Sequence, residues 1–97
     1  MAKGYWIGRV DVEDLDRYMG YVKANAAAFK EYGARFLVRG GAFETREGQS
    51  RSRNVVIEFP SYQAARDCYD SPVYQAAKAI REPVSICDLI IIEGYDA

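Results

Sequence analysis

Arginines and carboxylates that follow or interrupt apolar runs are the side chains of this chain best suited to chemistry. Arg39 comes directly after the apolar residues 36–38 and is followed by Gly40 and Gly41. Glu58 lies inside another apolar run further along the chain. A guanidinium can hold a carboxylate through two parallel hydrogen bonds, and a buried carboxyl group with a raised pKa can act as an acid or a base. Arg39 and Glu58 are therefore the first candidates for a site that holds and orients an anionic group.

Three interpretations of Arg39 and its two glycines have to be weighed. A phosphate-binding loop needs glycines that lead into a helix, whereas the polar segment that follows here is typical of a hairpin, so this interpretation is the weakest. An ion pair with Glu58 is the interpretation we favour, because a hairpin turn at residues 48–49 places the two opposite each other on neighbouring strands. A bulge at the glycines would shift that pairing. The third interpretation is an arginine that binds a carboxylate ligand.

Aromatic residues supply the candidate walls of such a pocket. Trp6, Tyr69 and Tyr74 stand at partly apolar positions of the expected strands and helices. Large aromatic side chains at such positions most often pack in the core, and the alternative is that they line a cleft between the sheet and its helices. Glu93 is a further carboxylate, for which we expect an ion pair with Arg9. The predicted ligand-pocket residues are Arg39, Glu58, Trp6, Tyr69 and Tyr74, and no catalytic residue is assigned.

The chain contains no histidine. This absence excludes Ser-His-Asp and Cys-His catalysis, a histidine-ligated haem and the usual zinc sites. Cys68 and Cys87 are too far apart for a metal-binding or redox pair, and no histidine activates either thiol. We therefore expect neither a metal nor a cofactor.

Composition and length restrict the class of protein. With 97 residues we expect one domain over residues 1–97, and the net charge of −1 gives no general attraction to nucleic acid or to an anionic membrane. No apolar run approaches the roughly 18 residues that a membrane span needs, and the N-terminal residues do not resemble a signal peptide. We predict a cytoplasmic protein with two reduced thiols, because disulfides are rare in that compartment.

The order of the elements that position these residues predicts the fold class. Strands are expected at residues 5–12, 34–41, 55–59 and 88–96. Helices are expected from Leu15 to the residue before Gly33, and from residue 62 to about Arg81 with a new start at Ser71–Pro72. This βαββαβ order predicts an α+β, ferredoxin-like fold, in which a four-stranded antiparallel sheet carries both helices on one face.

Alternation along the strands assigns side chains to the two faces of that sheet. The set expected to meet the helices is apolar: Trp6, Gly8, Val10, Phe36, Val38, Val55, Ile57, Phe59, Ile90 and Ile92. The set expected on the other face is mixed: Tyr5, Ile7, Arg9, Arg35, Leu37, Arg39, Val56, Glu58, Leu89, Ile91, Glu93 and Tyr95. The second set is too apolar to face water, so we expect a second copy of the chain to cover it as a homodimer.

The segments GYWIGRVDV, GARFLVRGG, VVIEFPSYQAARDCYDSPVYQAAKAIR and DLIIIEGYD together resemble a small bacterial family known only as a domain of unknown function (number 1330). The resemblance covers nearly the whole chain, and it implies a dimeric α/β barrel in which two ferredoxin-like sheets pack face to face. The wider superfamily holds cofactor-free antibiotic-biosynthesis monooxygenases, muconolactone isomerases and haem-dependent peroxidases. The haem branch needs a proximal histidine, which this chain lacks. The resemblance thus implies a fold and an assembly, with no established reaction.

Two function hypotheses follow from the sequence. The first is a small-molecule-binding protein or cofactor-independent enzyme, in which Arg39 holds an anionic, carboxylate-bearing organic molecule and Glu58 orients it. The second is a non-catalytic dimeric module for regulation or assembly. RNA-recognition domains share the topology but need exposed aromatic residues on the third strand, where this chain offers Val56 and Glu58 instead. We therefore expect no nucleic-acid partner and no membrane partner.

Overall fold

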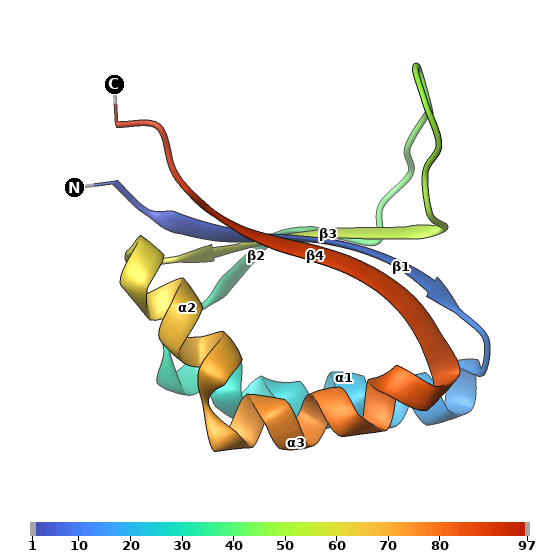
Figure 1. Ribbon diagram of the computed structural model, residues 1–97, viewed down its shortest axis with the longest axis horizontal. Coiled ribbons are helices and arrows are strands. Elements are labelled where there is room, and N and C mark those ends of the chain that lie inside the picture. Colours follow the sequence, from blue (N-terminus) through green and yellow to red (C-terminus); the bar gives the residue numbers. More distant parts are fainter. Residues whose placement is uncertain (1, 97) are drawn as a thin grey trace.

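Four strands and three α-helices make up most of residues 2–96, the part of the chain that the structure, a computed structural model, describes (Figure 1). In chain order the elements are β1 (Gly4–Val12), α1 (Leu15–Glu31), β2 (Arg35–Arg39), β3 (Arg53–Phe59), α2 (Tyr62–Asp70), α3 (Pro72–Arg81), the 3₁₀ turn η1 (Glu82–Val84) and β4 (Ser85–Glu93). The predicted βαββαβ order is confirmed, with the second helical segment divided into α2 and α3. No helix within residues 2–96 has both the length and the apolar character that crossing a membrane requires.

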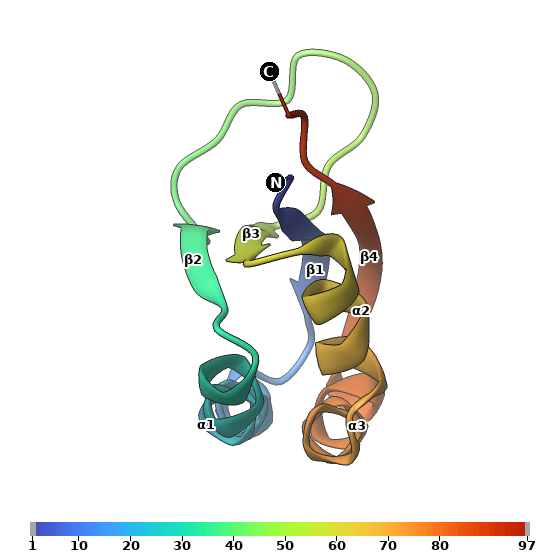
Figure 2. The ribbon, with the colours of Figure 1, turned by 90° about the vertical axis from the view of Figure 1, so that its left-hand side faces the viewer.

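The strands form one antiparallel sheet in the order β2-β3-β1-β4. Therefore β3 lies between β2 and β1, which are connected through α1, and β1 lies between β3 and β4, which are connected through α2 and α3. Figure 2 shows that α1, α2 and α3 all lie on the same face of the sheet, while no helix of the described chain covers the opposite face. This is the predicted ferredoxin-like fold, in which the sheet and the helices enclose a core on one side only.

Short polar side chains set where the helices begin. Asp14 accepts a hydrogen bond from the backbone N–H of Arg17 at 3.2 Å and so caps α1. The Ser61 hydroxyl caps α2 in the same way. Ser71 is the residue at which α2 ends and α3 begins, because its hydroxyl accepts the N–H of Tyr74 at 3.2 Å. This confirms the new helix start predicted at Ser71–Pro72.

The core between the layers is built around Trp6, which is 1% exposed. Its ring lies 4.8 Å from that of Tyr74, 5.2 Å from that of Phe59 and 5.3 Å from that of Phe29, measured between ring centroids. Its indole N–H donates to the carbonyl of Ala65 at 2.8 Å, so the polar atom of this buried side chain is satisfied. Trp6 thus joins the central strand β1 to all three helices.

The expected facing of the last strand is wrong. Trp6 pairs with Ile91 and Gly8 pairs with Leu89, so these β4 residues turn toward the helices. Ile90 and Ile92 are instead 55% and 46% exposed on the helix-free face. The strand also begins earlier than expected, at Ser85. An unbroken apolar run has no alternation from which its facing could be deduced, and the pairing with β1 decides it.

The predicted pairing of Arg39 with Glu58 is also wrong. β2 pairs with β3 through Phe36 and Ile57, and then through Val38 and Val56, so that Leu37 is an extra residue in β2. Such a bulge turns the following residues to the other face of a sheet. Arg39 therefore lies opposite Val55, on the face that meets the helices.

Glu58 lies on the helix-free face with other partners. Its carboxylate is 3.5 Å from the guanidinium of Arg35 and accepts a hydrogen bond from the Tyr5 hydroxyl at 3.2 Å. The expected pair of Arg9 with Glu93 is likewise wrong, because Arg9 lies 3.6 Å from Asp88. The charges of this face are thus paired among themselves, although with different partners from those predicted.

Candidate functional site

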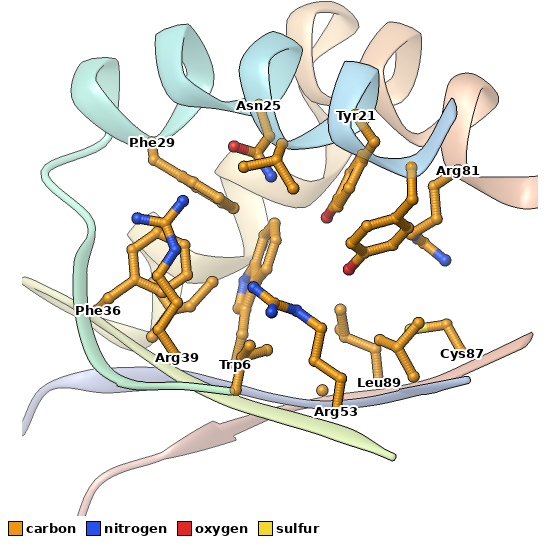
Figure 3. Close-up of a pocket in the computed structure, with 16 residues that line it drawn as sticks. Trp6, Tyr21, Asn25, Phe29, Phe36, Arg39, Arg53, Arg81, Cys87 and Leu89 are labelled. Carbon is orange, nitrogen blue, oxygen red and sulfur yellow. The ribbon is translucent and has the colours of Figure 1, made fainter. Parts of the chain in front are cut away.

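A cavity of about 30 Å³ lies between the sheet and the helices (Figure 3). Its sheet side is formed by Trp6, Val55 and Leu89, and its helix side includes Tyr21 and Asn25 of α1. A cavity needs roughly 10–15 Å³ of such volume to hold one water molecule. The space therefore accepts a group of two or three non-hydrogen atoms, the size of a carboxylate, and a larger molecule has to extend outward from it.

Two arginines reach this cavity from neighbouring strand ends. Arg39 ends β2, and its guanidinium lies 4.1 Å from the centre of the Phe36 ring. Arg53 begins β3 and lies beside Gly40, whose backbone N–H donates to the Asn54 carbonyl at 2.9 Å. Figure 3 shows both side chains leaving the strands in the direction of the helices. The bulge in β2 and the alternation of β3 thus bring two positive charges to one side of the cavity.

A third arginine enters from the end of α3. Arg81 is only 6% exposed, and its guanidinium lies 5.3 Å from the centre of the Tyr21 ring. It donates to the Tyr74 hydroxyl at 3.4 Å, and that hydroxyl lies 2.8 Å from the hydroxyl of Tyr21. The two tyrosines and Arg81 form a buried polar cluster at the side of the cavity away from Arg39.

None of these three arginines has a carboxylate partner among residues 2–96. The Nε atoms of Arg53 and Arg81 are buried and have no hydrogen-bond partner within the described chain. The residues that line the cavity include no aspartate and no glutamate. Arg81 is buried and Arg53 is half-buried, whereas Arg39 is exposed at the mouth of the cavity. A buried charge without a partner is costly, so Arg81 and Arg53 in particular are suited to an anion from outside the chain.

Two open hollows adjoin the cavity on opposite sides. The first, of about 270 Å³, shares Arg39 and Arg53 with the cavity and is otherwise walled mainly by apolar residues, including Leu15 and Met19 of α1. The second, of about 290 Å³, shares Arg81 with the cavity and lies between α3 and β4. The arginines therefore stand at both boundaries between the enclosed space and solvent.

Burial favours the protonated form of Tyr18, Tyr74 and Cys87 in and beside the site. Burial raises the pKa of Tyr18 and of Tyr74 above the ordinary value for tyrosine, although Arg53 and Arg81 act in the opposite direction. Burial also raises the pKa of the Cys87 thiol. Tyrosine hydroxyls can therefore donate to an anion, and the charge of the site comes from its arginines. The described residues bring no three histidine, cysteine or acidic side chains together as a metal would require.

The structure brings some of the predicted site residues together and separates others. Arg39 and Trp6 both line the cavity. Tyr74 reaches its edge through the hydrogen bond with Tyr21, and Tyr69 lines the hollow between α3 and β4. Glu58 lies on the opposite face of the sheet, so it cannot orient a ligand that Arg39 holds.

Sequence reasoning missed Arg53 and Arg81. Arg53 stands at the end of the polar segment that follows Gly41, yet it has the same parity as Val55 and Ile57 and therefore shares their face. Arg81 continues the helical face of Tyr74 and Ala77, both of which are buried. The alternation of the strand would have placed Arg53 on the face toward the helices, and the spacing along the helix would have placed Arg81 on its buried face.

Solved structures of other proteins have the same fold. The chain is similar to the RPA0582 protein of unknown function from Rhodopseudomonas palustris, with a TM-score of 0.77, 16% identity, and 99% of this chain and 85% of that chain covered. It is similar to SnoaB, a cofactor-independent oxygenase from Streptomyces nogalater (TM-score 0.65, 12% identity, 100% and 97% covered). It is also similar to a dimeric protein of unknown function and ferredoxin-like fold from Bacteroides fragilis (TM-score 0.55, 11% identity, 94% and 95% covered). At these identities the likeness shows the fold alone.

The family of the chain is shown by its sequence. Among curated proteins no relative matches it. The sequence model of the family described as "Domain of unknown function (DUF1330)" matches residues 3–95, which is nearly the whole chain. The matched range contains the segments that carry the resemblance, from GYWIGRVDV to DLIIIEGYD, apart from the last residue of DLIIIEGYD. The chain therefore belongs to the DUF1330 family.

Proposed function

We propose that the protein is a small-molecule-binding protein or a cofactor-independent enzyme whose ligand is a small organic molecule with a carboxylate. The observation that carries this proposal is the group of three arginines around one cavity, none of them paired with an acid in the described chain. A carboxylate is flat and can accept two hydrogen bonds from one guanidinium, which fits the narrow space between the layers. Arg39 and Arg53 hold the carboxylate, and Trp6 forms the wall behind it.

The chemistry that such a site supports is limited by its residues. It contains no histidine and no carboxylate that could take a proton from the ligand, and burial raises the pKa of Tyr18 above the ordinary value for tyrosine. Positive charge stabilises negative charge that develops on a bound molecule. Because the site supplies no base, a reaction here would need a ligand that is already an anion when it binds. The fold is shared with SnoaB, a cofactor-independent oxygenase.

A thermal-shift experiment tests the proposal. A ligand at ten times its dissociation constant adds about 1.4 kcal/mol to the free energy of unfolding, which for a chain of this size is roughly 5–10 °C in Tm. We expect a shift of this kind from at least one member of a panel of small carboxylates, and none from inorganic phosphate. The shift should disappear in Arg53→Met.

Arg66→Met provides the matched control. Arg66 also lies over an aromatic ring, that of Tyr62 at 5.6 Å, but it is exposed on α2 and does not line the cavity. This variant should keep the full ligand-induced shift. An equal shift in Arg53→Met, or an equal response of the wild-type protein to inorganic phosphate, would contradict a carboxylate site in the cleft.

We also propose that the protein is a cytoplasmic homodimer formed through the helix-free face of the sheet. That face carries the exposed apolar side chains of Ile7, Val38, Ile86, Ile90 and Ile92. The segment between β2 and β3 and the C-terminal end both extend beyond it (Figure 1). Cys68 and Cys87 are free, which suits a reducing compartment. Glu58 on this face and the balanced net charge argue against nucleic acid as a partner.

The second candidate function, a non-catalytic dimeric module for regulation or assembly, is favoured by that apolar face alone. It gives no role to the unpaired arginines on the other side of the sheet. It predicts that no carboxylate raises the Tm of the dimer, so the same thermal-shift panel distinguishes the two candidates.

A further inference from the structure

We propose, on the basis of the carboxylate site above, that the ligand is an amphipathic monocarboxylate. Its carboxylate lies between Arg39 and Arg53, and its apolar chain or ring lies in the hollow beside α1, over Leu15 and Met19. The enclosed cavity sets the first limit, because about 30 Å³ leaves room for the head group alone. The remainder of the molecule has to occupy one of the two hollows that open from the cavity.

The two hollows differ in character, and the difference selects the one beside α1. The hollow between α3 and β4 is polar and contains Lys78 and Glu82, which form an ion pair at 3.6 Å. Its exposed charges are thus already balanced by each other. The hollow beside α1 shares Arg39 and Arg53 with the cavity, and neither arginine has a carboxylate partner in the described chain. An anion is therefore drawn to the α1 side.

The walls of the α1 hollow indicate what lies beyond the carboxylate. Apart from the arginines and Tyr18, it is lined by Val12, Leu15, Met19 and Val22. Leu15 is 64% exposed and Met19 is 44% exposed, although the rest of their surroundings is apolar and concave. Apolar surface of this kind gains free energy when an apolar group covers it. Methionine in particular adapts to ligands of different shape.

The charges around the hollow determine how many anionic groups the ligand has. Its lining includes the guanidinium groups of Arg39 and Arg53 at the inner end and no lysine or third arginine toward solvent. A second carboxylate at the outer end would lie over Leu15 and Met19 without a partner. The geometry thus selects a monocarboxylate with an apolar tail over a dicarboxylate.

Isothermal titration calorimetry with a homologous series tests this inference. The probes are acetate, butyrate, hexanoate and octanoate, all below their aggregation limits, with succinate as the dicarboxylate. Each methylene buried in the hollow is expected to raise the affinity about fourfold, until the hollow is full. Succinate is expected to bind no better than acetate. The tail-dependent gain should be accompanied by a negative change in heat capacity, the signature of apolar burial.

Variants locate the tail. Leu15→Gln with Met19→Gln should keep the affinity for acetate and reduce the gain per methylene to less than twofold. Val73→Gln is the control, since Val73 is similarly exposed, at 43%, on α3 and does not line the hollow. Circular dichroism checks that each variant is folded.

The outcomes separate this inference from the function on which it rests. If all acids bind with the same affinity, or if the double variant keeps the full gain per methylene, the amphipathic ligand is refuted and the carboxylate site stands. If succinate binds more tightly than hexanoate, the monocarboxylate is refuted in the same way. If no acid binds to the wild-type protein, both the inference and the proposed function fail.

Discussion

Arg81 carries a positive charge in the core, where it contacts two tyrosines and forms no ion pair with an acid of residues 2–96. Its Nε is buried without a hydrogen-bond partner in the described chain, and its one hydrogen bond to Tyr74, at 3.4 Å, is long. Arg51 is the opposite case, because it donates to Asp11 and to Asp88 at 2.8 Å each. We therefore expect the two arginines to contribute differently to stability.

Replacing Arg81 tests whether its charge serves a ligand. In Arg81→Met the free energy of unfolding without ligand should be unchanged or higher, by up to about 4 kcal/mol, as when buried charges are replaced by apolar groups of similar volume. Arg51→Met should lower it, because both carboxylates lose their partner. Urea unfolding measures both. A loss of stability in Arg81→Met as large as that in Arg51→Met would show that Arg81 is structural.

At the scale of elements, the hairpin between β2 and β3 places the arginines of the cleft. Gly40 has a φ of +70°, and a Cβ atom built on it would lie 2.7 Å from the Arg53 guanidinium. Gly48 has a φ of +75° but open space around it. Gly41 has no positive φ, and a Cβ atom built on it would meet no atom within 4 Å. Substitution of Gly40 therefore combines backbone strain with a contact to Arg53, substitution of Gly48 brings the strain alone, and substitution of Gly41 brings neither.

We expect Gly40→Ala and Gly48→Ala each to lose roughly 1–2 kcal/mol of stability, because both place a Cβ in the left-handed region. Only Gly40→Ala should also weaken carboxylate binding, since it displaces Arg53. Gly41→Ala should change neither quantity. Urea unfolding and ligand titration of the three variants provide the comparison. Equal ligand affinity in Gly40→Ala and Gly48→Ala would show that Arg53 does not depend on this turn.

An ionic contact joins the segment between β2 and β3 to the sheet, because Arg51 pairs with Asp11 of β1 and Asp88 of β4. The backbone N–H of Ser52, and then the guanidinium of Arg51, lower the pKa of Asp11. The hydrogen bond from Arg51 likewise lowers the pKa of Asp88. Carboxyl groups with a lowered pKa bind fewer protons in the folded state than in the unfolded state. Their contribution is therefore present above about pH 4 and is lost as the pH falls below it.

This contact predicts an acid-dependent loss of stability. The free energy of unfolding should fall as the pH is lowered from about 4 to 2, and the decrease should be smaller in the double variant Asp11→Asn, Asp88→Asn. The double variant should also be less stable than the wild type at pH 7. Denaturant unfolding across this pH range measures the slope. An unchanged slope in the double variant would assign the acid sensitivity to other carboxylates.

The sequence predicted the elements better than the facing of their side chains. Alternation in β1 and β3 and the caps at Asp14, Ser61 and Ser71 carry local signals, so the order of elements and the break between α2 and α3 could be read from residue types. The bulge at Leu37 has no marker of its own, because neither glycine nor a change in polarity stands there. The sequence could therefore not show that Arg39 turns away from Glu58.

At the scale of the whole molecule, a sheet covered on one face by helices leaves its second face to be explained. Exposed isoleucines on β1 and β4 surround a few internally paired charges there. We expect Ile90→Lys to shift the protein from dimer toward monomer, because a second copy would have to bury the new charge without a partner. Sedimentation velocity measures the change.

Val73→Lys is the control for this experiment, since Val73 is 43% exposed on α3, away from the helix-free face. It should leave the oligomeric state unchanged. A wild-type protein that is monomeric at micromolar concentration, or an Ile90→Lys variant that remains fully dimeric, would contradict an interface on this face. Ligand binding by Ile90→Lys then shows whether the cleft functions within one copy.

If the arginines between the sheet and the helices bind a carboxylate, the fluorescence of Trp6 can report the binding directly. Trp6 is the only tryptophan of the chain and lines the cavity. A titration of its fluorescence with hexanoate should show a saturable change in the wild-type protein. The change should be absent from the folded double variant Arg39→Met, Arg53→Met and retained in Arg66→Met. A flat titration of the wild-type protein, or the same saturation curve in the double variant, would contradict carboxylate binding by these arginines.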